Sequence, residues 1–344
     1  MQKAAPPSPT SSRSSNIFQV AMEAGVSITT VSHVFSGKRQ VSEETRRRVL
    51  AVAELLDYKP RASARALATG RSMTIAVQHW LSGPEYALSP FFGAMLTSMS
   101  EAAIGAGYSF IFVPADPSPD VFVTPLIGER RIDGAILIDP VPGDVFVDAV
   151  IEHKLPTVSM GRVEGHPEKL TVDHDHARAL AGVLEHLGSQ GYERPAMLSL
   201  VAETSYVADM GAAFERLTAA GSPLLAAAEF SERSGYELGL ELLEAPDRPD
   251  AIFCVNDVLA VGVARAASER GLIVPDELGI VGVGDSPFAR DAPVPLTSVR
   301  LFPERAGRLL LELIEAVLAG GEHEPDSPDP IPTELVVRAS TVRR

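Results

Sequence analysis

Four consecutive residues, Asp173, His174, Asp175 and His176, carry side chains that can bind metal ions. A protein metal site gathers three or four such ligands around one ion. These four lie where an expected strand passes into an expected helix, and Asp and His side chains commonly cap helices at such junctions. Helix capping is therefore the reading that the sequence favours over metal binding.

Signatures of catalysis and phosphate binding are missing from the sequence. Gly279, Gly282 and Gly284 do not have the spacing of a dinucleotide-binding loop, and neither a P-loop nor a nucleophile elbow occurs. We therefore expect no enzyme activity, no cofactor and no metal site.

A different chemistry is indicated near the start of the chain, where NIFQVAMEAGVSITTVSHVFSG predicts two short helices around a tight turn. Gly25 permits the backbone reversal, and the Ser27 hydroxyl is placed to cap the second helix. In that helix Val31, Val34 and Phe35 share the inner face. Short side chains near the start of such a helix suit close approach to base edges in a DNA major groove. The outward-facing residues are Ile28, Thr29, Ser32 and His33.

Charge divides the chain into two parts. Residues 1–72 carry eleven Lys and Arg against five acids, a net charge of +6, whereas the remainder carries −21. A basic head can neutralise phosphates while an acidic body is repelled from the duplex. Ser42 is expected to cap a third helix, SEETRRRVLAVAELLDY, in which Arg46 is positioned to contact a phosphate.

Composition indicates a cytoplasmic, nucleoid-associated protein. The single cysteine, Cys254, excludes an intramolecular disulfide, and the first residues have no apolar stretch typical of a signal peptide. No run approaches the roughly 20 apolar residues of a membrane helix.

From residue 72 onward, short apolar runs alternate with amphipathic stretches, which predicts parallel sheets with helices on both faces. The length suggests two doubly wound lobes, with a ligand cleft where the carboxyl ends of strands meet. Strands are expected at Thr74–Val77, Ser109–Val113, Ala135–Ile138, Thr157–Met160, Ala196–Leu200, Ala251–Val255 and Ile280–Val283. Helices are expected at Phe91–Gly105, Asp144–His153, Ala177–Gln190, Ser205–Ala220, Ser231–Leu243, Val258–Arg270 and Pro303–Leu318.

The head resembles that of the lac repressor (LacI/GalR) family of transcriptional regulators. It contains, in order and at full spacing, A-x-x-A-G-V-S-x-x-T-V-S-x-V from Ala21, V-S-x-x-T-R-x-x-V from Val41 and Y-x-P-x-x-x-A-R-x-L from Tyr58. The body resembles the type I periplasmic-binding-protein-like regulators through blocks such as SPFFGAML, RPDAIFCVNDVLAVGV and GLIVPDELGIVGVGDSP. The resemblance covers nearly the whole chain except the first fifteen residues. It implies an all-α helix-turn-helix head on a two-lobed α/β body.

The resemblance implies roles for the head. Ile28, Thr29 and His33 match positions that read bases, Ser27 and Ser32 lie nearer phosphates, and Thr30 belongs to the same DNA-binding set. The family usually has Arg where this chain has His33, and a neutral imidazole cannot form the bidentate fork of an Arg on guanine. The alternative is a surface histidine that touches nothing.

Residues 61–68, RASARALA, resemble the family hinge, a short helix that is ordered on operator DNA. Leu67 matches the leucine inserted between base steps of the minor groove, and Arg61 and Ser63 are expected to contact DNA beside it. Eight residues are too few for a stable isolated helix, so the order must come from DNA or a partner hinge. The alternative is a flexible linker with Leu67 packed on the body.

Family position also predicts an effector site in the cleft. Aromatic side chains there can stack on a sugar ring or purine, while polar side chains can form paired hydrogen bonds with hydroxyl groups. The alternatives are core packing for the aromatic residues and helix capping for the Asn-Asp pair. Gly284 replaces a carboxylate that commonly binds ligand, and Ala208 replaces an Arg, which weakens the expectation of a standard pyranose site. The expected effector-binding residues are Trp80, Phe92, Arg162, Asn256, Asp257 and Asp285.

The predicted organisation is a disordered tail (1–15), a helix-turn-helix domain (16–60), a hinge (61–71) and an effector-binding and dimerisation body (72–344). We expect a repressor that acts as a homodimer on a near-palindromic operator, with a sugar or related metabolite as effector. The C-terminus has no appended apolar heptad, which favours a dimer over a tetramer. Two alternatives are a solute-binding receptor, opposed by the basic head and missing export signal, and a sugar-metabolising enzyme.

Overall fold

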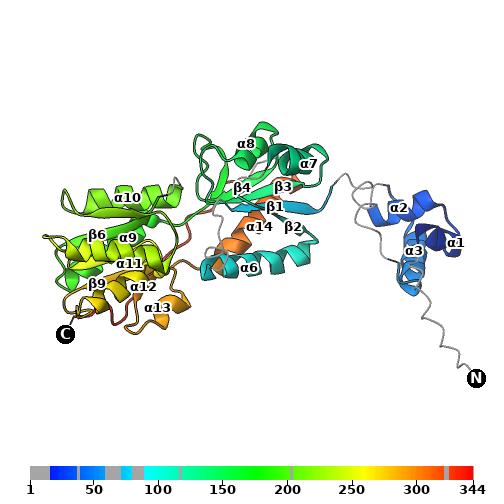
Figure 1. The fold of residues 1–344 in the computed structure, drawn as a ribbon. Coiled ribbons are helices and arrows are strands. Elements are labelled where there is room, and N and C mark those ends of the chain that lie inside the picture. Colours follow the sequence, from blue (N-terminus) through cyan, green and yellow to red (C-terminus); the bar gives the residue numbers. More distant parts are fainter. Residues whose placement is uncertain are drawn as a thin grey trace, which may run out of the picture. The chain divides into compact units, whose positions relative to one another are not determined.

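The computed structural model describes residues 16–36, 39–58, 71–79, 89–115, 118–201, 204–320 and 325–343. It divides into two compact units, residues 1–73 and 74–344, which are considered separately (Figure 1). The predicted tail, nearly all of the predicted hinge and Trp80 lie outside the described residues.

The first unit, the head, consists of helices α1 (Ile17–Glu23), α2 (Ile28–Ser36) and α3 (Glu43–Leu55). Asn16 and Gln19 form a capping box at the start of α1, each side chain accepting from the other's backbone N–H. Gly25, with φ of +62°, makes the turn into α2. The helices enclose a small core of Val20, Ala21, Ala24, Val31, Val34, Val49 and Ala53.

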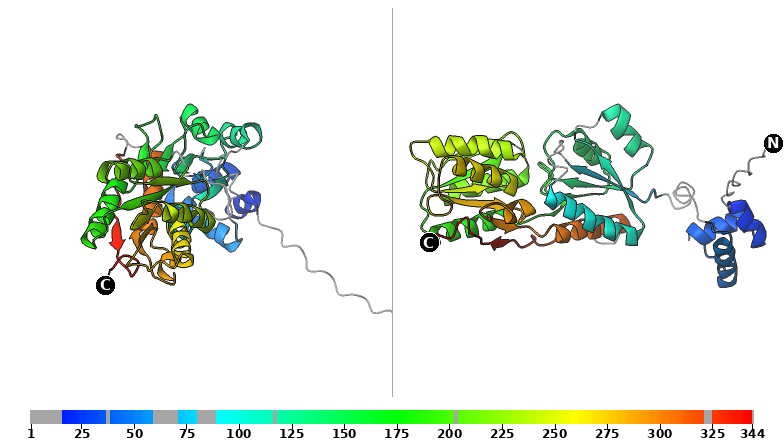
Figure 2. Two further views of the ribbon diagram at one scale, coloured as in Figure 1. Left: turned by 60° about the vertical axis from the view of Figure 1, so that its left-hand side comes forward. Right: turned by 60° about the horizontal axis from the view of Figure 1, so that its bottom comes forward.

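The second unit, the body, contains two lobes (Figures 1 and 2). The N-terminal lobe has an all-parallel sheet in the order β2-β1-β3-β4-β5. Its strands are β1 (Thr74–His79), β2 (Ser109–Val113), β3 (Gly134–Ile138), β4 (Thr157–Met160) and β5 (Leu170–Val172). Its helices are α6 (Pro90–Ala106), the π-helical turn η1 (Pro119–Val123), α7 (Thr124–Gly128), α8 (Val145–Glu152) and α14 (Pro303–Ala319). Ile136 and Ile138 face one core and Leu137 the other, as expected of a strand covered on both faces.

The C-terminal lobe has a sheet in the order β11-β10-β9-β8-β6-β7, parallel except for the edge strand β11. Its strands are β6 (Pro195–Leu200), β7 (Leu224–Ala227), β8 (Ala251–Cys254), β9 (Gly279–Val283), β10 (Thr297–Arg300) and β11 (Glu334–Val336). Its helices are α9 (His176–Ser189), α10 (Ser205–Leu217), α11 (Glu232–Glu244), α12 (Asp257–Glu269) and α13 (Pro287–Arg290).

The chain crosses between the lobes after β5, after β10 and before β11. Helix α14 therefore belongs to the N-terminal lobe, where it packs beside α6 (Figure 2). The three crossovers meet at His174: its Nε2 donates to the Leu301 carbonyl (2.6 Å), and Ile331 forms a bridge with it. This junction links the two lobes.

The predicted fold class is confirmed: a helical head precedes two doubly wound α/β lobes. All seven expected strands and all seven expected helices are present, with ends shifted by up to three residues. Strands β5, β7, β10 and β11 and helices α7 and α13 were not predicted. Within the described residues, no helix combines the length and apolar character needed to cross a bilayer.

Candidate functional site

The first candidate site is the exposed start of α2 in the head. Ser27 caps this helix as predicted, because its Oγ accepts from the Thr30 backbone N–H (3.0 Å) and lies 2.8 Å from the Thr30 hydroxyl. Ile28 and Thr29 are exposed, and the next helical turn presents the half-buried Ser32 and His33. The structure thus gathers the predicted base-reading side chains on one face of α2.

Arg46 extends from α3 and remains exposed. Its guanidinium donates a long hydrogen bond to the Val34 carbonyl of α2 (3.5 Å), which places a positive charge beside this helix. Such an arginine is suited to a phosphate contact. The hinge residues predicted to bind DNA, Arg61, Ser63 and Leu67, lie outside the described residues.

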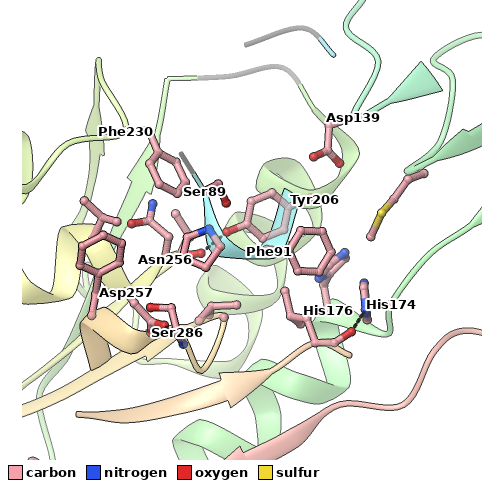
Figure 3. Close-up of a pocket in the computed structure, with 18 of the residues that line it drawn as sticks. Ser89, Phe91, Asp139, His174, His176, Tyr206, Phe230, Asn256, Asp257 and Ser286 are labelled. Carbon is pink, nitrogen blue, oxygen red and sulfur yellow. Dashed lines mark hydrogen bonds between the residues drawn. The ribbon is translucent and has the colours of Figure 1, made fainter. Parts of the chain in front are cut away.

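The second candidate site is a pocket between the two lobes of the body, with an empty volume of about 700 Å³ including its open mouth. The carboxyl ends of β3 and β5 from one lobe and of β8 and β9 from the other supply much of its lining, as expected for doubly wound sheets. The remaining walls include Ser89 and Phe91 at the start of α6, Tyr206 on α10, and Phe230 (Figure 3). Phe288 of α13 also lines the pocket.

Asn256 and Asp257 lie in this pocket, as predicted. The Asn256 Oδ1 accepts from the Leu259 N–H (2.8 Å) and so caps α12, whereas its Nδ2 is buried without a partner among the described residues. Asn256 is therefore both a helix cap and a pocket residue with an unused donor.

Among the described residues, the groups that hydrogen-bond to Asp257 all belong to the C-terminal lobe. Its carboxylate accepts from the Ser298 hydroxyl (2.6 Å) and from the Ser286 N–H (2.8 Å). Burial raises the pKa of Asp257 to about 6, against the opposing effect of these hydrogen bonds. A side chain on residue 284 would lie 3.2 Å from this carboxylate, so Gly284 leaves room for Asp257 here.

Two buried histidines form the pocket wall nearest the crossovers (Figure 3). His174 donates through Nε2 to Leu301, and burial lowers the pKa of His174 to about 4, so the ring is neutral near pH 7. His176 donates through Nε2 to the Asp173 carboxylate (3.0 Å). Both Nδ1 atoms are buried and lack a partner among the described residues. The neutral His174 ring therefore presents an unused acceptor, and His176 presents an unpaired ring nitrogen.

Asp173, His174 and His176 each offer a ligand atom, and these three atoms lie within 4.8 Å of one another. A cation could be held there, although each of the three side chains already makes a hydrogen bond. The predicted capping role falls to Asp175, whose carboxylate accepts from the Arg178 N–H (2.9 Å) at the start of α9.

Asp139 follows β3 in the pocket wall and was not predicted. It adopts a positive φ of 48°, which is strained for a residue with a Cβ. Burial and the Asp173 carboxylate raise the pKa of Asp139 to about 7, with His176 acting in the opposite direction. No hydrogen bond from the described residues reaches its carboxyl group.

Tyr206 stands beside this carboxyl group and was also not predicted. It donates to the Val255 carbonyl, and its ring centroid is 5.1 Å from that of His176. Burial raises the pKa of Tyr206 well above its usual value, so the phenol stays neutral. Asp139 could have been predicted from its position directly after a buried strand. Nothing in the sequence around Tyr206 indicated a pocket residue.

Three other predicted effector residues do not line this pocket. Phe92 packs in the N-terminal lobe, with its ring centroid 4.9 Å from that of His79. Arg162 forms a two-pronged ion pair with Asp209 of α10 (2.6 and 2.7 Å). Asp285 accepts from Arg300 (2.8 Å) and Arg338, and these bonds outweigh burial and lower its pKa. Their roles in effector binding remain predictions.

The Arg162 contact connects the lobes. Arg162 follows β4, while Asp209 and Ser205 belong to α10, and the Arg162 N–H also donates to the Ser205 hydroxyl (2.9 Å). Gly161 permits this approach, because a Cβ there would lie 3.0 Å from that hydroxyl. The side chains remain partly exposed, so the pair is accessible to water.

Comparisons with known proteins agree with both units. Residues 16–61 match the model of bacterial regulatory proteins of the lacI family, and residues 184–341 match that of a periplasmic binding protein-like domain. The HTH-type transcriptional repressor PurR of Mannheimia succiniciproducens is 30% identical over 94% of this chain and 98% of its own length. The HTH-type transcriptional regulator DegA of Bacillus subtilis is 30% identical over 94% of this chain and 97% of its own.

Solved structures are similar over the whole chain. A complex of the transcriptional regulator CelR with cellobiose is 26% identical, with a TM-score of 0.71 and coverage of 95% of this chain and 99% of that one. The lac repressor dimer bound to operator and the anti-inducer ONPF shares the fold at 22% identity, with a TM-score of 0.77 and coverage of 96% and 100%. From the helix-turn-helix head, the two-lobed body and these full-length similarities we conclude that the chain belongs to the LacI family of DNA-binding transcriptional regulators, and is not an enzyme.

Proposed function

We propose that this regulator is a cytoplasmic repressor that binds a near-palindromic operator as a homodimer and is controlled by a small molecule in the pocket between its lobes. The DNA contacts would come from residues 16–60 and the hinge at 61–71, and the effector contacts from the body at 72–344. The effector contacts that we propose include Asn256, His174 and His176.

The observation that carries this proposal is a set of buried polar atoms around one pocket, among them three ring and amide nitrogens. The Nδ1 atoms of His174 and His176 and the Nδ2 of Asn256 lack partners among the described residues. Unsatisfied buried polar groups cost roughly 1–3 kcal/mol each, so a ligand that pairs with them would be favoured.

The junction at His174 suggests how binding would be transmitted. The same histidine that faces the pocket donates to Leu301 in a second crossover and bridges Ile331 in a third. A ligand touching His174 would therefore bias the angle between the lobes, and with it the spacing of the two heads in a dimer. The regulator CelR in its cellobiose complex and the operator-bound lac repressor dimer support this scheme.

A binding experiment tests the proposal. DNA selected by the full-length protein from a random pool should yield a near-palindromic site, and a metabolite library can then be screened for compounds that change affinity for that DNA. The Asn256→Ala variant should keep DNA binding and lose the response. A response that survives unchanged in Asn256→Ala would remove the effector site from this pocket.

A further inference from the structure

The walls of the pocket are acidic and aromatic, and this composition restricts the ligand. The described lining residues include three carboxyl groups, those of Asp139, Asp173 and Asp257, and neither Lys nor Arg. The guanidinium groups of Arg290 and Arg300 line an adjacent hollow and are hydrogen-bonded to Asp285, and that of Arg162 is paired with Asp209. A phosphate or carboxylate in the pocket would therefore meet carboxyl groups without a countercharge from the described lining residues.

The three carboxyl groups differ in whether they already accept hydrogen bonds from the protein. Both oxygens of Asp257 accept hydrogen bonds from within the C-terminal lobe, and Asp173 accepts from His176 and from the His174 N–H. Asp139 accepts none from the described residues, although it lies in the pocket wall. The strained backbone at Asp139 fits a residue that is kept for ligand binding rather than for stability.

Aromatic rings surround the same space. Tyr206 and Phe91 stand near Asp139 and the histidines, and the ring centroids of Phe91 and His174 are 6.2 Å apart (Figure 3). Phe230 and Phe288 of the C-terminal lobe also line the pocket. The faces of aromatic rings attract cations when water is excluded. The neutral His174 ring adds its unpaired Nδ1 as an acceptor, and the Nδ1 of His176 is also buried without a partner among the described residues.

Building on the proposed function, we infer that the pocket takes an organic cation, an amine or quaternary ammonium compound, whose positive charge lies against the Asp139 carboxylate within the ring of aromatic side chains. The uncharged part of such a ligand would reach the Nδ2 donor of Asn256. Neutral sugars would lack the charge contact, and anionic metabolites would be repelled.

Binding of a cation should depend on pH in a defined direction. The groups that face Asp139 are Asp173 after β5, His176 on α9 and the neutral Tyr206 on α10. Since the pKa of Asp139 is raised to about 7, the carboxyl is largely protonated at pH 6 and largely ionised at pH 8. A ligand with a permanent positive charge should therefore bind several-fold more tightly at pH 8.

Matched ligands of equal shape test the inference on the full-length protein. Choline, its uncharged isostere 3,3-dimethyl-1-butanol and the anion 3,3-dimethylbutanoate form one set; glucosamine, glucose and glucuronate form another. Calorimetric titration should show the cation bound about tenfold or more tightly than its neutral partner in at least one set, with the anion weakest. In Asp139→Asn, which preserves the shape of the side chain, the cation should lose this preference, while the exposed control Asp148→Asn should keep it.

The outcomes separate this inference from the proposed function. Equal or weaker binding of the cations in both sets, or a preference that Asp139→Asn retains, would overturn the inference. If a neutral or anionic compound then released the selected DNA through Asn256, the effector pocket would stand and only its charge preference would be wrong. If cations bound through Asp139 but neither they nor any library compound changed DNA affinity, the regulatory role would fail instead.

Discussion

At the scale of single residues, burial of the Asp139 carboxyl group should lower the stability of the folded protein when this group is ionised. Its pKa rises from 3.8 in the reference state to about 7 in the native structure, chiefly through burial. The native state thus holds the proton more tightly than the unfolded chain does. Stability is consequently lost as pH rises between about 4 and 7, and the loss is complete above that range.

Asp139→Asn should therefore stabilise the unliganded protein, and more so at pH 8 than at pH 5. The gain at pH 8 should be on the order of 1–3 kcal/mol, measured as an increase in melting temperature. The exposed Glu185→Gln, on the surface of α9, is the matched control and should change little at either pH. A pH-independent effect of Asp139→Asn would mean that its carboxyl titrates normally.

In the head, Thr29 is exposed at the start of α2, where a side chain can reach a base edge. Thr29→Ala should weaken binding to the selected operator by about 1–3 kcal/mol and leave binding to random DNA nearly unchanged. Leu55→Ala is a suitable control, because Leu55 is 85% exposed at the end of α3. Fluorescence anisotropy measures the affinity for each DNA. An equal loss of affinity for both would mean that Thr29 contacts the DNA backbone and not a base.

At the scale of elements, close packing of helices depends on particular glycines. A Cβ on Gly262 of α12 would lie 2.2 Å from the Glu232 carbonyl oxygen, and one on Gly235 of α11 would lie 2.3 Å from the Leu259 carbonyl oxygen. Gly307 of α14 has the same relation to the Met95 carbonyl oxygen of α6. These contacts are with backbone atoms, so the helices themselves would have to separate.

Gly262→Ala should therefore destabilise the body by about 1–3 kcal/mol or more, despite the better helix propensity of alanine. Gly182→Ala provides the control, since Gly182 lies in α9 with nothing within 4 Å of the added Cβ. It should be neutral or stabilise by up to about 1 kcal/mol. Denaturant unfolding of the two variants gives the comparison, and equal effects would show that α11 and α12 can move apart freely.

The sequence predicted the elements with long apolar patterns and missed four short strands, of which β5, β7 and β11 lie at sheet edges and β10 lies next to an edge. Strand β5 has only three residues, Leu170–Val172, and edge strand β11 is held by pairing with β10, which local propensity does not encode. Asn256 and Asp257 were expected in the cleft from the positions that they match in the family. Asp139 and Tyr206 were missed because the pocket brings together segments that are distant in sequence, and Asp285 is engaged by arginines that only the fold brings to it.

At the scale of the whole body, the ion pair of Arg162 with Asp209 joins the two lobes, supported by the Arg162 N–H bond to Ser205. The hydrogen bond with Asp209 raises the pKa of Arg162, so the guanidinium stays charged at any working pH. Because both side chains are partly exposed, the pair should stabilise the closed arrangement by roughly 0.2–1 kcal/mol. That is enough to shift a balanced open and closed equilibrium a few-fold.

Arg162 could either close the lobes or bind effector, and these two roles predict opposite effects of removing its partner Asp209. If Arg162 mainly closes the lobes, Arg162→Ala and Asp209→Ala should open the unliganded body equally, and the exchange Arg162→Asp with Asp209→Arg should restore closure. If Arg162 instead binds effector, Asp209→Ala should free the guanidinium and strengthen binding, whereas Arg162→Ala abolishes it and the exchange restores nothing. Small-angle scattering of the unliganded variants, together with effector titration, distinguishes the two roles. Arg233→Ala, which breaks an ion pair with Glu237 inside α11, is the control and should change neither measurement, because that pair does not connect the lobes.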